Sequence, residues 1–178
     1  MRSVCVFAGS RPGARPDYIT SAARLGQTLA ERGIQLVYGG SRNGLMGHVA
    51  DEALRHGGGV VGIMPTGLFT AEIVHRDLSE FIEVHDMHER KATMGKRADG
   101  FIALPGGIGT FEELFEVLCW SQIGIHAKPL GLLNVQGYYD PLLALIRHSV
   151  QEGFSSPESL DSIYVSDDPA ILLHQMLR

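Results

Sequence analysis

The sequence predicts an α/β fold in which a doubly wound parallel sheet is sandwiched by helices, as a single domain over residues 1–178. Short apolar runs alternate with longer amphipathic runs along the chain, the pattern of alternating strands and helices. Several short runs are apolar at consecutive positions, as expected for parallel strands covered on both faces. A length of 178 residues suits one domain with one core.

The elements follow in order. Strands are expected at residues 4–8, 35–38, 60–64, 81–84, 101–104 and 130–135, with a weaker one at 162–165. After the first strand, Ala22, Leu25 and Leu29 recur at helical spacing, and Gly33 follows where a C-cap glycine belongs. Further helices are expected at residues 45–56, 87–98, 110–122, 141–151 and 169–177. Right-handed crossovers would place these helices on both faces of the sheet, which is a Rossmann-like arrangement.

Composition narrows the function classes. The formal charge of -5 argues against a nucleic-acid partner, because phosphate backbones are bound by clustered Lys and Arg. Cys5 and Cys119 are too few for a disulfide framework and are expected to be buried thiols. No apolar run reaches the roughly 20 residues that span a bilayer, so no membrane partner and a cytoplasmic location are expected.

Glycine-rich loops follow four of the strands. They are Gly9-Ser10-Arg11, Gly39-Gly40-Ser41, Pro65-Thr66-Gly67 and Pro105-Gly106-Gly107. Ligands bind outside the carboxyl ends of open α/β sheets, where glycine lets the backbone approach a ligand closely. The alternative is that these glycines and prolines serve turn geometry alone. Four such loops on one edge favour a binding site that includes Ser10 and Gly40.

The densest loop, residues 105–113, combines three glycines and a hydroxyl group before a helix. Backbone N–H groups there would form a cradle for an anion such as phosphate. A GxGxxG pattern begins at Gly107, but its sixth position is Glu112, and no GxxxxGK occurs, so neither NAD nor ATP binding is supported. A carboxylate beside a phosphate would repel it, so the two acids, Glu112 and Glu113, are expected to face a sugar.

The helix after this loop carries apolar residues on more than one face. At about 100° per residue, an apolar stripe is formed by Phe111, Leu114, Phe115 and Leu118. Glu113 and Trp120 then point nearly opposite, and that outer face also carries Val117. We expect a second subunit to cover this face, with Glu113 near the seam. The alternative is a single exposed tryptophan, which requires no partner.

A basic helix start forms the other unusual segment. Arg90 lies in the helix that begins near Met87, where a positive charge opposes the helix dipole. An anionic partner, either a carboxylate or a ligand phosphate, is therefore expected, and a solvated charge run is the alternative. His85 and His88 lack the further ligands that a metal site needs, and no Ser-His-Asp set or activated cysteine is recognisable.

Together these segments resemble the LOG family of nucleoside 5′-monophosphate phosphoribohydrolases. Residues 105–113 match its PGGxGTxxE pattern at every fixed position, and Met87-His88-Glu89-Arg90-Lys91 is similar to its second motif. The resemblance covers roughly residues 4–165 and includes Gly39-Gly40 and Gly44-Leu45-Met46-Gly47.

This resemblance implies a homodimer at least, without metal or cofactor, that hydrolyses AMP or an N6-substituted AMP such as a cytokinin ribotide. It implies that Arg90 and Glu113 are the catalytic pair. It assigns phosphate and ribose to Gly106, Gly107, Ile108, Gly109, Thr110, Phe111 and Glu112, and substrate contacts to Glu72, Met87, Arg90 and Lys91. Members have often been labelled lysine decarboxylases, which would require a lysine that binds pyridoxal phosphate.

The chemistry of hydrolysis agrees with these residues. Breaking an N-glycosidic bond builds positive charge on the ribose carbon, which a fixed carboxylate stabilises. Glu113 would supply that carboxylate or orient water, and an ion pair with Arg90 would keep it ionised. The alternative function is a nucleotide-binding or carrier module, which needs the glycines but not this pair.

Overall fold

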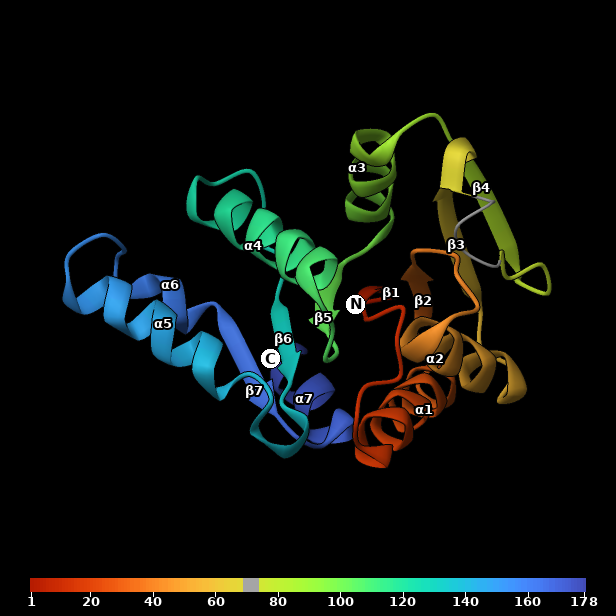
Figure 1. Ribbon diagram of the computed structural model, residues 1–178, viewed down its shortest axis with the longest axis horizontal. Helices are drawn as coiled ribbons and strands as arrows, with labels where there is room; N and C mark the ends of the chain where they lie inside the picture. The colour runs from red at the N-terminus through yellow and green to blue at the C-terminus, as the bar shows by residue number, and fades with distance from the viewer. Residues whose placement is uncertain (69–73) are drawn as a thin grey trace.

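A parallel sheet of seven strands forms the centre of the protein (Figure 1). The computed structural model describes residues 1–68 and 74–178, so Glu72 lies outside the described residues. The strands are β1 (Ser3–Phe7), β2 (Gln35–Tyr38), β3 (Val60–Pro65), β4 (Glu80–Val84), β5 (Gly100–Ala103), β6 (Leu130–Leu133) and β7 (Ile163–Ser166). The predicted α/β class and all seven predicted strands are confirmed, with bounds that differ by at most two residues.

The strand order, β4-β3-β2-β1-β5-β6-β7, places the start of the chain in the middle of the sheet. Successive strands run outward from β1 on one side and then, beginning with β5, on the other. Adjacent β1 and β5 pair in parallel from Val4 opposite Gly100 to Phe7 opposite Ala103. The direction in which successive strands are added to the sheet therefore reverses between β1 and β5. The carboxyl ends of these two strands border the crevice where open α/β sheets bind ligands.

Helices cover both faces of the sheet (Figure 1). On one face α1 (Pro16–Glu31), α2 (Gly44–Arg55) and α7 (Pro169–Met176) contribute to one apolar core. On the other, α3 (Met87–Arg97), α4 (Ile108–Gln122) and α5 (Asp140–Gln151) contribute to a second core. The shorter helices are α6 (Glu158–Asp161), η1 (Thr66–Leu68) and η2 (Val135–Gly137). The predicted doubly wound sandwich is confirmed.

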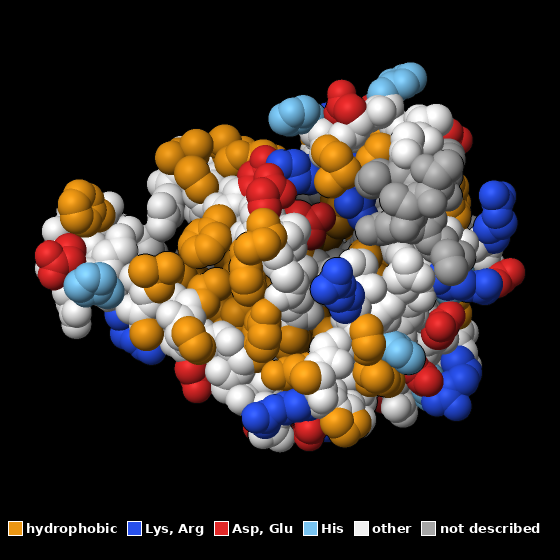
Figure 2. Space-filling model, viewed as in Figure 1, with side chains coloured by type: hydrophobic (Ala, Val, Ile, Leu, Met, Phe, Trp, Pro, Cys, Tyr) orange, Lys and Arg blue, Asp and Glu red, His pale blue; other side chains and the backbone are white. Residues whose placement is uncertain are grey.

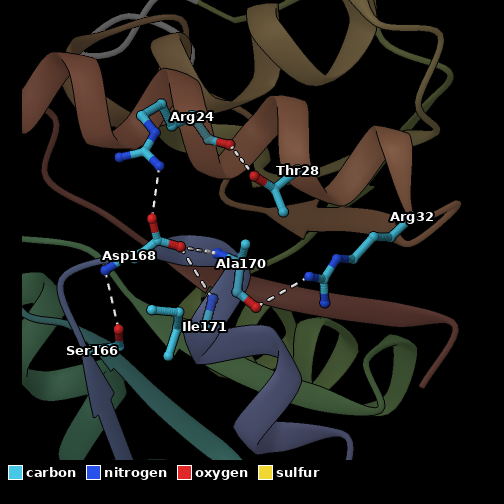
Figure 3. Close-up of polar contacts among 7 residues, drawn as sticks. All are labelled: Arg24, Thr28, Arg32, Ser166, Asp168, Ala170 and Ile171. Atoms are coloured by element: carbon cyan, nitrogen blue, oxygen red, sulfur yellow. Dashed lines mark hydrogen bonds and ion pairs between the residues drawn. The ribbon is translucent and has the colours of Figure 1, made fainter.

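A polar cluster fixes α7 against α1 (Figure 3). Asp168 caps α7 by accepting the N–H groups of Ala170 at 2.8 Å and Ile171 at 3.1 Å. Arg24 of α1 donates to the same carboxylate at 2.8 Å. The hydrogen bond from Ile171 is the largest cause of the lowered pKa of Asp168. One carboxylate thus stabilises the helix start and joins two distant parts of the chain.

The buried face of α4 differs from the prediction. Val117, expected on the outer face, is buried with Leu114 and Leu118 in the second core. Phe115, expected in the apolar stripe, is instead 41% exposed. Trp120 is half-buried, and its ring lies 3.8 Å from the position of a Cβ atom built at Gly95 in α3. The helix carries apolar residues on several of its faces, so periodicity alone did not identify the face that packs against the sheet.

The cysteines were also only partly predicted. Cys5 is buried, but Cys119 is exposed, and both thiols are free. Burial raises the pKa of the Cys5 thiol. No helix among residues 1–68 and 74–178 is long and apolar enough to cross a membrane.

Candidate active site

A pocket of about 580 Å³ opens at the carboxyl ends of β1 and β5. Its walls come from the loops after β1, β2 and β5, the start of α3 and the start of α4. Figure 2 shows a hollow on this side of the molecule, with acidic and basic side chains together at its rim. The volume is in the range of small-molecule sites, roughly 300 to 1,000 Å³. The pocket therefore lies where the strand order places a ligand.

The start of α4 presents unpaired backbone N–H groups to this pocket. Gly107 is the N-cap residue and provides no side-chain cap. The first hydrogen bond of the helix runs from the N–H of Phe111 to the carbonyl of Gly107, at 3.1 Å. The N–H groups of residues 107–110 therefore have no partner within the helix. Together with the positive end of the helix dipole, they form a site suited to a phosphate.

Glycine is required beneath this cradle because two loops touch there. A Cβ atom at Gly9 would lie 3.1 Å from the Cα of Gly106, and one at Gly106 would lie 2.9 Å from the amide nitrogen of Gly9. A side chain at Gly106 would also meet Thr110 Oγ1 at 2.1 Å. The Gly9 N–H donates to the carbonyl of Pro105 at 3.3 Å, which joins the β1 and β5 loops.

Tyr18 and Tyr138 line one side of the pocket, and Phe111 packs against Tyr138 outside it. Tyr138 donates a hydrogen bond from its hydroxyl to the carbonyl of Gly106. Its ring stacks on Phe111 at 6.4 Å and meets Tyr18 edge-on at 5.8 Å. Burial raises the pKa of Tyr138, so its hydroxyl remains a donor. This wall supports the glycine loop from outside α4.

Arg90 is buried and held by backbone carbonyls. Its Nε donates to the carbonyl of Ile63 at 3.0 Å, and its Nη2 donates to the carbonyl of Gly39 at 2.9 Å. These carbonyls come from within β3 and from the loop that follows β2. Nη1 lies 3.8 Å from the sulfur of Met87. The guanidinium is thus fixed in the pocket wall without a carboxylate partner at salt-bridge distance among the described residues.

Glu113 lines the same pocket but does not form the expected ion pair. No Arg90–Glu113 contact within 4.0 Å occurs in the described structure, because the guanidinium is directed to the two carbonyls. Burial raises the pKa of Glu113 to about 7, and the more distant charge of Arg90 only partly opposes this. The prediction that an ion pair with Arg90 keeps Glu113 ionised is therefore wrong: with a pKa of about 7, the carboxyl is divided between its two forms near neutral pH.

Lys91 balances the acids on the exposed side of α4. Its Nζ lies 2.5 Å from Glu112 Oε1 and 3.1 Å from Glu116 Oε1. Burial alone would lower the pKa of Lys91, but the hydrogen bonds to both carboxylates outweigh it and raise the pKa. Lys91 thus joins α3 to α4 and neutralises Glu112, and its positive charge is already balanced by protein carboxylates.

Comparison with known proteins gives the family. The model of a family described as "possible lysine decarboxylase" matches residues 46–176. The Arabidopsis thaliana cytokinin riboside 5′-monophosphate phosphoribohydrolase LOG2 is 51% identical over 99% of this chain and 82% of its own length. The Oryza sativa subsp. japonica probable cytokinin riboside 5′-monophosphate phosphoribohydrolase LOGL9 is 51% identical over 98% of this chain and 77% of its own length. The chain belongs to the LOG family.

Solved structures extend the likeness of this LOG-family chain. The molybdenum cofactor binding protein of Rippkaea orientalis has a TM-score of 0.72 and 25% identity, over 99% of this chain and 97% of that protein. The molybdenum cofactor carrier protein of Chlamydomonas reinhardtii has a TM-score of 0.68 and 21% identity, over 98% of this chain and 97% of that protein. The latter likeness shows the shared fold alone.

Most of the predicted site residues meet in the pocket of this LOG-family protein. Those that line it are Ser10, Met87, Arg90, Gly106, Gly107, Ile108, Gly109, Thr110, Glu112 and Glu113. Gly40, Lys91 and Phe111 do not line it: Gly40 accepts the His75 N–H at 3.0 Å, and Phe111 stacks behind Tyr138. Glu72 lies outside the described residues.

Several lining residues were not predicted, among them Arg11, Tyr18, Gly39, Met94 and Tyr138. The loop positions of Arg11 and Gly39 signalled a site, but their neighbours were chosen instead. The two tyrosines carried no such signal, because they lie far from the glycine motifs along the chain. Among the described residues that line the pocket there is no lysine. The pocket therefore does not fit covalent attachment of pyridoxal phosphate, as the family description would require.

Proposed function

We propose that this chain hydrolyses the N-glycosidic bond of a purine nucleoside 5′-monophosphate, releasing free base and ribose 5-phosphate. The observation that carries the proposal is the presence, in one pocket, of an unpaired helix start together with Arg90 and Glu113. The relatives named as phosphoribohydrolases support it, since they are about half identical over nearly the whole chain. AMP or an N6-substituted AMP, such as a cytokinin ribotide, is the proposed substrate.

Binding starts at the phosphate. The N–H groups of residues 107–110 receive the 5′-phosphate, and this remote contact positions the ribose for reaction. Hydrolysis then breaks the bond between the ribose carbon C1′ and the base nitrogen, and the bonding electron pair leaves with the base. Water adds its oxygen to C1′, and its released proton balances the charge on the departing base.

Glu113 acts at the ribose carbon in its ionised form. A carboxylate there stabilises the positive charge that develops on C1′, or orients the attacking water. Arg90, fixed by the carbonyls of Gly39 and Ile63, adds a positive charge where the base departs as an anion. Because the pKa of Glu113 in the free protein is about 7, the active fraction and kcat/KM rise as the pH rises through neutrality.

A carrier function is the second candidate, favoured by the fold shared with the molybdenum cofactor binding protein of Rippkaea orientalis. A carrier needs the cradle but has no use for Arg90 and Glu113, so their position in the pocket favours hydrolysis. The test is chromatography after incubation with AMP, N6-isopentenyl-AMP and adenosine. We expect free base from both nucleotides and almost none from adenosine. Intact nucleotides after prolonged incubation would favour a carrier, and equal rates on AMP and adenosine would contradict the phosphate cradle.

A homodimer in the cytoplasm completes the proposal, although on a different face of α4 than expected. Val117 is buried in the subunit itself, but Phe115 is 41% exposed, and Ile123 and Ile125 beyond it are 66% and 63% exposed. Burying these side chains against a second copy would remove apolar surface from water. Light scattering should give twice the chain mass for the wild type and the chain mass for Phe115→Glu. A wild-type monomer at micromolar concentration would contradict the dimer.

A further inference from the structure

Arg11 belongs to one of the glycine-rich loops and lines the pocket, but its side chain has no role in the function proposed above. It follows Ser10 in the loop after β1, is exposed to solvent and lines the pocket. We propose that Arg11 is a phosphate ligand, whose guanidinium closes over a phosphomonoester bound at the start of α4. The inference deepens the proposed function and rests on it for the nature of the ligand.

The charges in the pocket single out this side chain. Arg11, Arg90, Glu112 and Glu113 are the charged residues among the described pocket lining. Arg90 donates to the carbonyls of Gly39 and Ile63, and Glu112 is paired with Lys91. Arg11 has no ion pair or side-chain hydrogen bond with any described residue. It is therefore the lining cation whose donors remain available to a ligand.

The backbone places Arg11 beside the cradle. The Gly9 N–H donates to the carbonyl of Pro105 at 3.3 Å, so the β1 loop runs against the loop that leads into α4. On its other side the same loop is held by α2, whose Leu45 N–H donates to the carbonyl of Gly9 at 3.0 Å. Gly44 packs so closely that a Cβ atom there would lie 2.4 Å from the Arg11 amide nitrogen. The backbone of Arg11 is thus fixed, two residues after the Gly9 N–H that contacts the loop leading into α4.

The chemistry of the ligand requires such a group. A phosphomonoester carries close to two negative charges near neutral pH, whereas a helix start offers the equivalent of roughly half a positive charge. The protein as a whole has a formal charge of -5, so local positive charge must attract the anion. A guanidinium provides a planar pair of donors that matches two phosphate oxygens. Arg11 supplies both the missing charge and this geometry.

The test is calorimetric binding of ribose 5-phosphate, which needs no bond cleavage. We expect Arg11→Ala to weaken binding about tenfold or more, as for loss of a charge-assisted phosphate contact. Arg11→Lys keeps the charge but not the planar pair of donors, so its affinity should lie between those of the wild type and Arg11→Ala. Where AMP is hydrolysed, KM should rise by a similar factor while kcat stays within about twofold, since the contact is equal in ground and transition states.

Arg15→Ala is the matched control. Arg15 is also exposed and lies four residues further on, but it does not line the pocket. We expect this variant to bind ribose 5-phosphate like the wild type. Equal weakening by both changes would overturn the inference, because it would show only a general effect of net charge, and so would wild-type binding by Arg11→Ala. The inference and the proposed function can also be separated. If the wild type binds ribose 5-phosphate but cleaves no nucleotide, and Arg11→Ala loses that binding, the role of Arg11 is supported and hydrolysis is refuted.

Discussion

Replacing Gly39 with alanine tests how Arg90 is positioned. Gly39 has no positive φ, so its backbone accepts alanine. The added Cβ atom would lie 1.9 Å from Arg90 Nη2, whereas ordinary contacts begin near 3.4 Å. The guanidinium must therefore move by about 1 Å or more, and misplacing a catalytic group by that distance can lower the rate about 100-fold. We expect Gly39→Ala to reduce kcat for AMP by about this factor while the protein remains folded.

Steady-state kinetics combined with thermal unfolding checks this prediction. In an Arg90→Ala background, Gly39→Ala should cost little more, because both changes remove the same placed group. Gly59→Ala is the matched control, since the nearest atoms to a Cβ there lie at 3.5 Å and Gly59 does not line the pocket. The reasoning is refuted if Gly39→Ala folds and retains kcat within about threefold of the wild type, or if the two losses simply multiply.

Two predictions concern stability and pH. Burial raises the pKa of Glu113 from 4.5 to about 7. The protonated carboxyl therefore stabilises the folded state fully below pH 4.5, and this stabilisation is lost as the pH rises through 7. Glu113→Gln should therefore unfold at a higher temperature than the wild type at pH 8 but not at pH 5, with a gain of at most about 3 kcal/mol; an unchanged difference across this range would contradict the buried carboxyl. Asp168→Ala should cost about 1 kcal/mol in urea unfolding, as for other N-caps. Because folding lowers the pKa of Asp168, its contribution to stability is present above the pKa of the unfolded state and is lost as the pH falls through the pKa of the folded state. Arg24→Ala should cost less, because the Arg24 side chain is about half exposed.

The fold and the place of the site were predictable because each rests on local sequence. Consecutive apolar residues identified buried parallel strands, and glycines after β1 and β5 marked the edge where the pocket lies. The cradle at residues 107–110 follows from a glycine loop before a helix, which requires no knowledge of tertiary contacts.

Other features depend on contacts between distant segments and were missed. The buried face of α4 was wrong because the packing of Val117 depends on neighbouring elements, not on the periodicity of one helix. Arg90 was expected to pair with Glu113, but its guanidinium instead donates to backbone carbonyls within β3 and in the loop after β2. Burial of Glu113 raises its pKa, a consequence that no spacing along the chain reveals.

The most direct test of the account is the rate of AMP cleavage by Glu113→Gln. The substitution preserves the volume of the side chain and removes its charge, so AMP binding at the cradle should survive. We expect kcat to fall at least about 100-fold, the scale of losing an electrostatic or acid-base group. The remaining activity should also lack the rise through pH 7 that the raised pKa of Glu113 predicts for the wild type. A Glu113→Gln enzyme that releases adenine with nearly wild-type kcat would contradict the proposed role of Glu113.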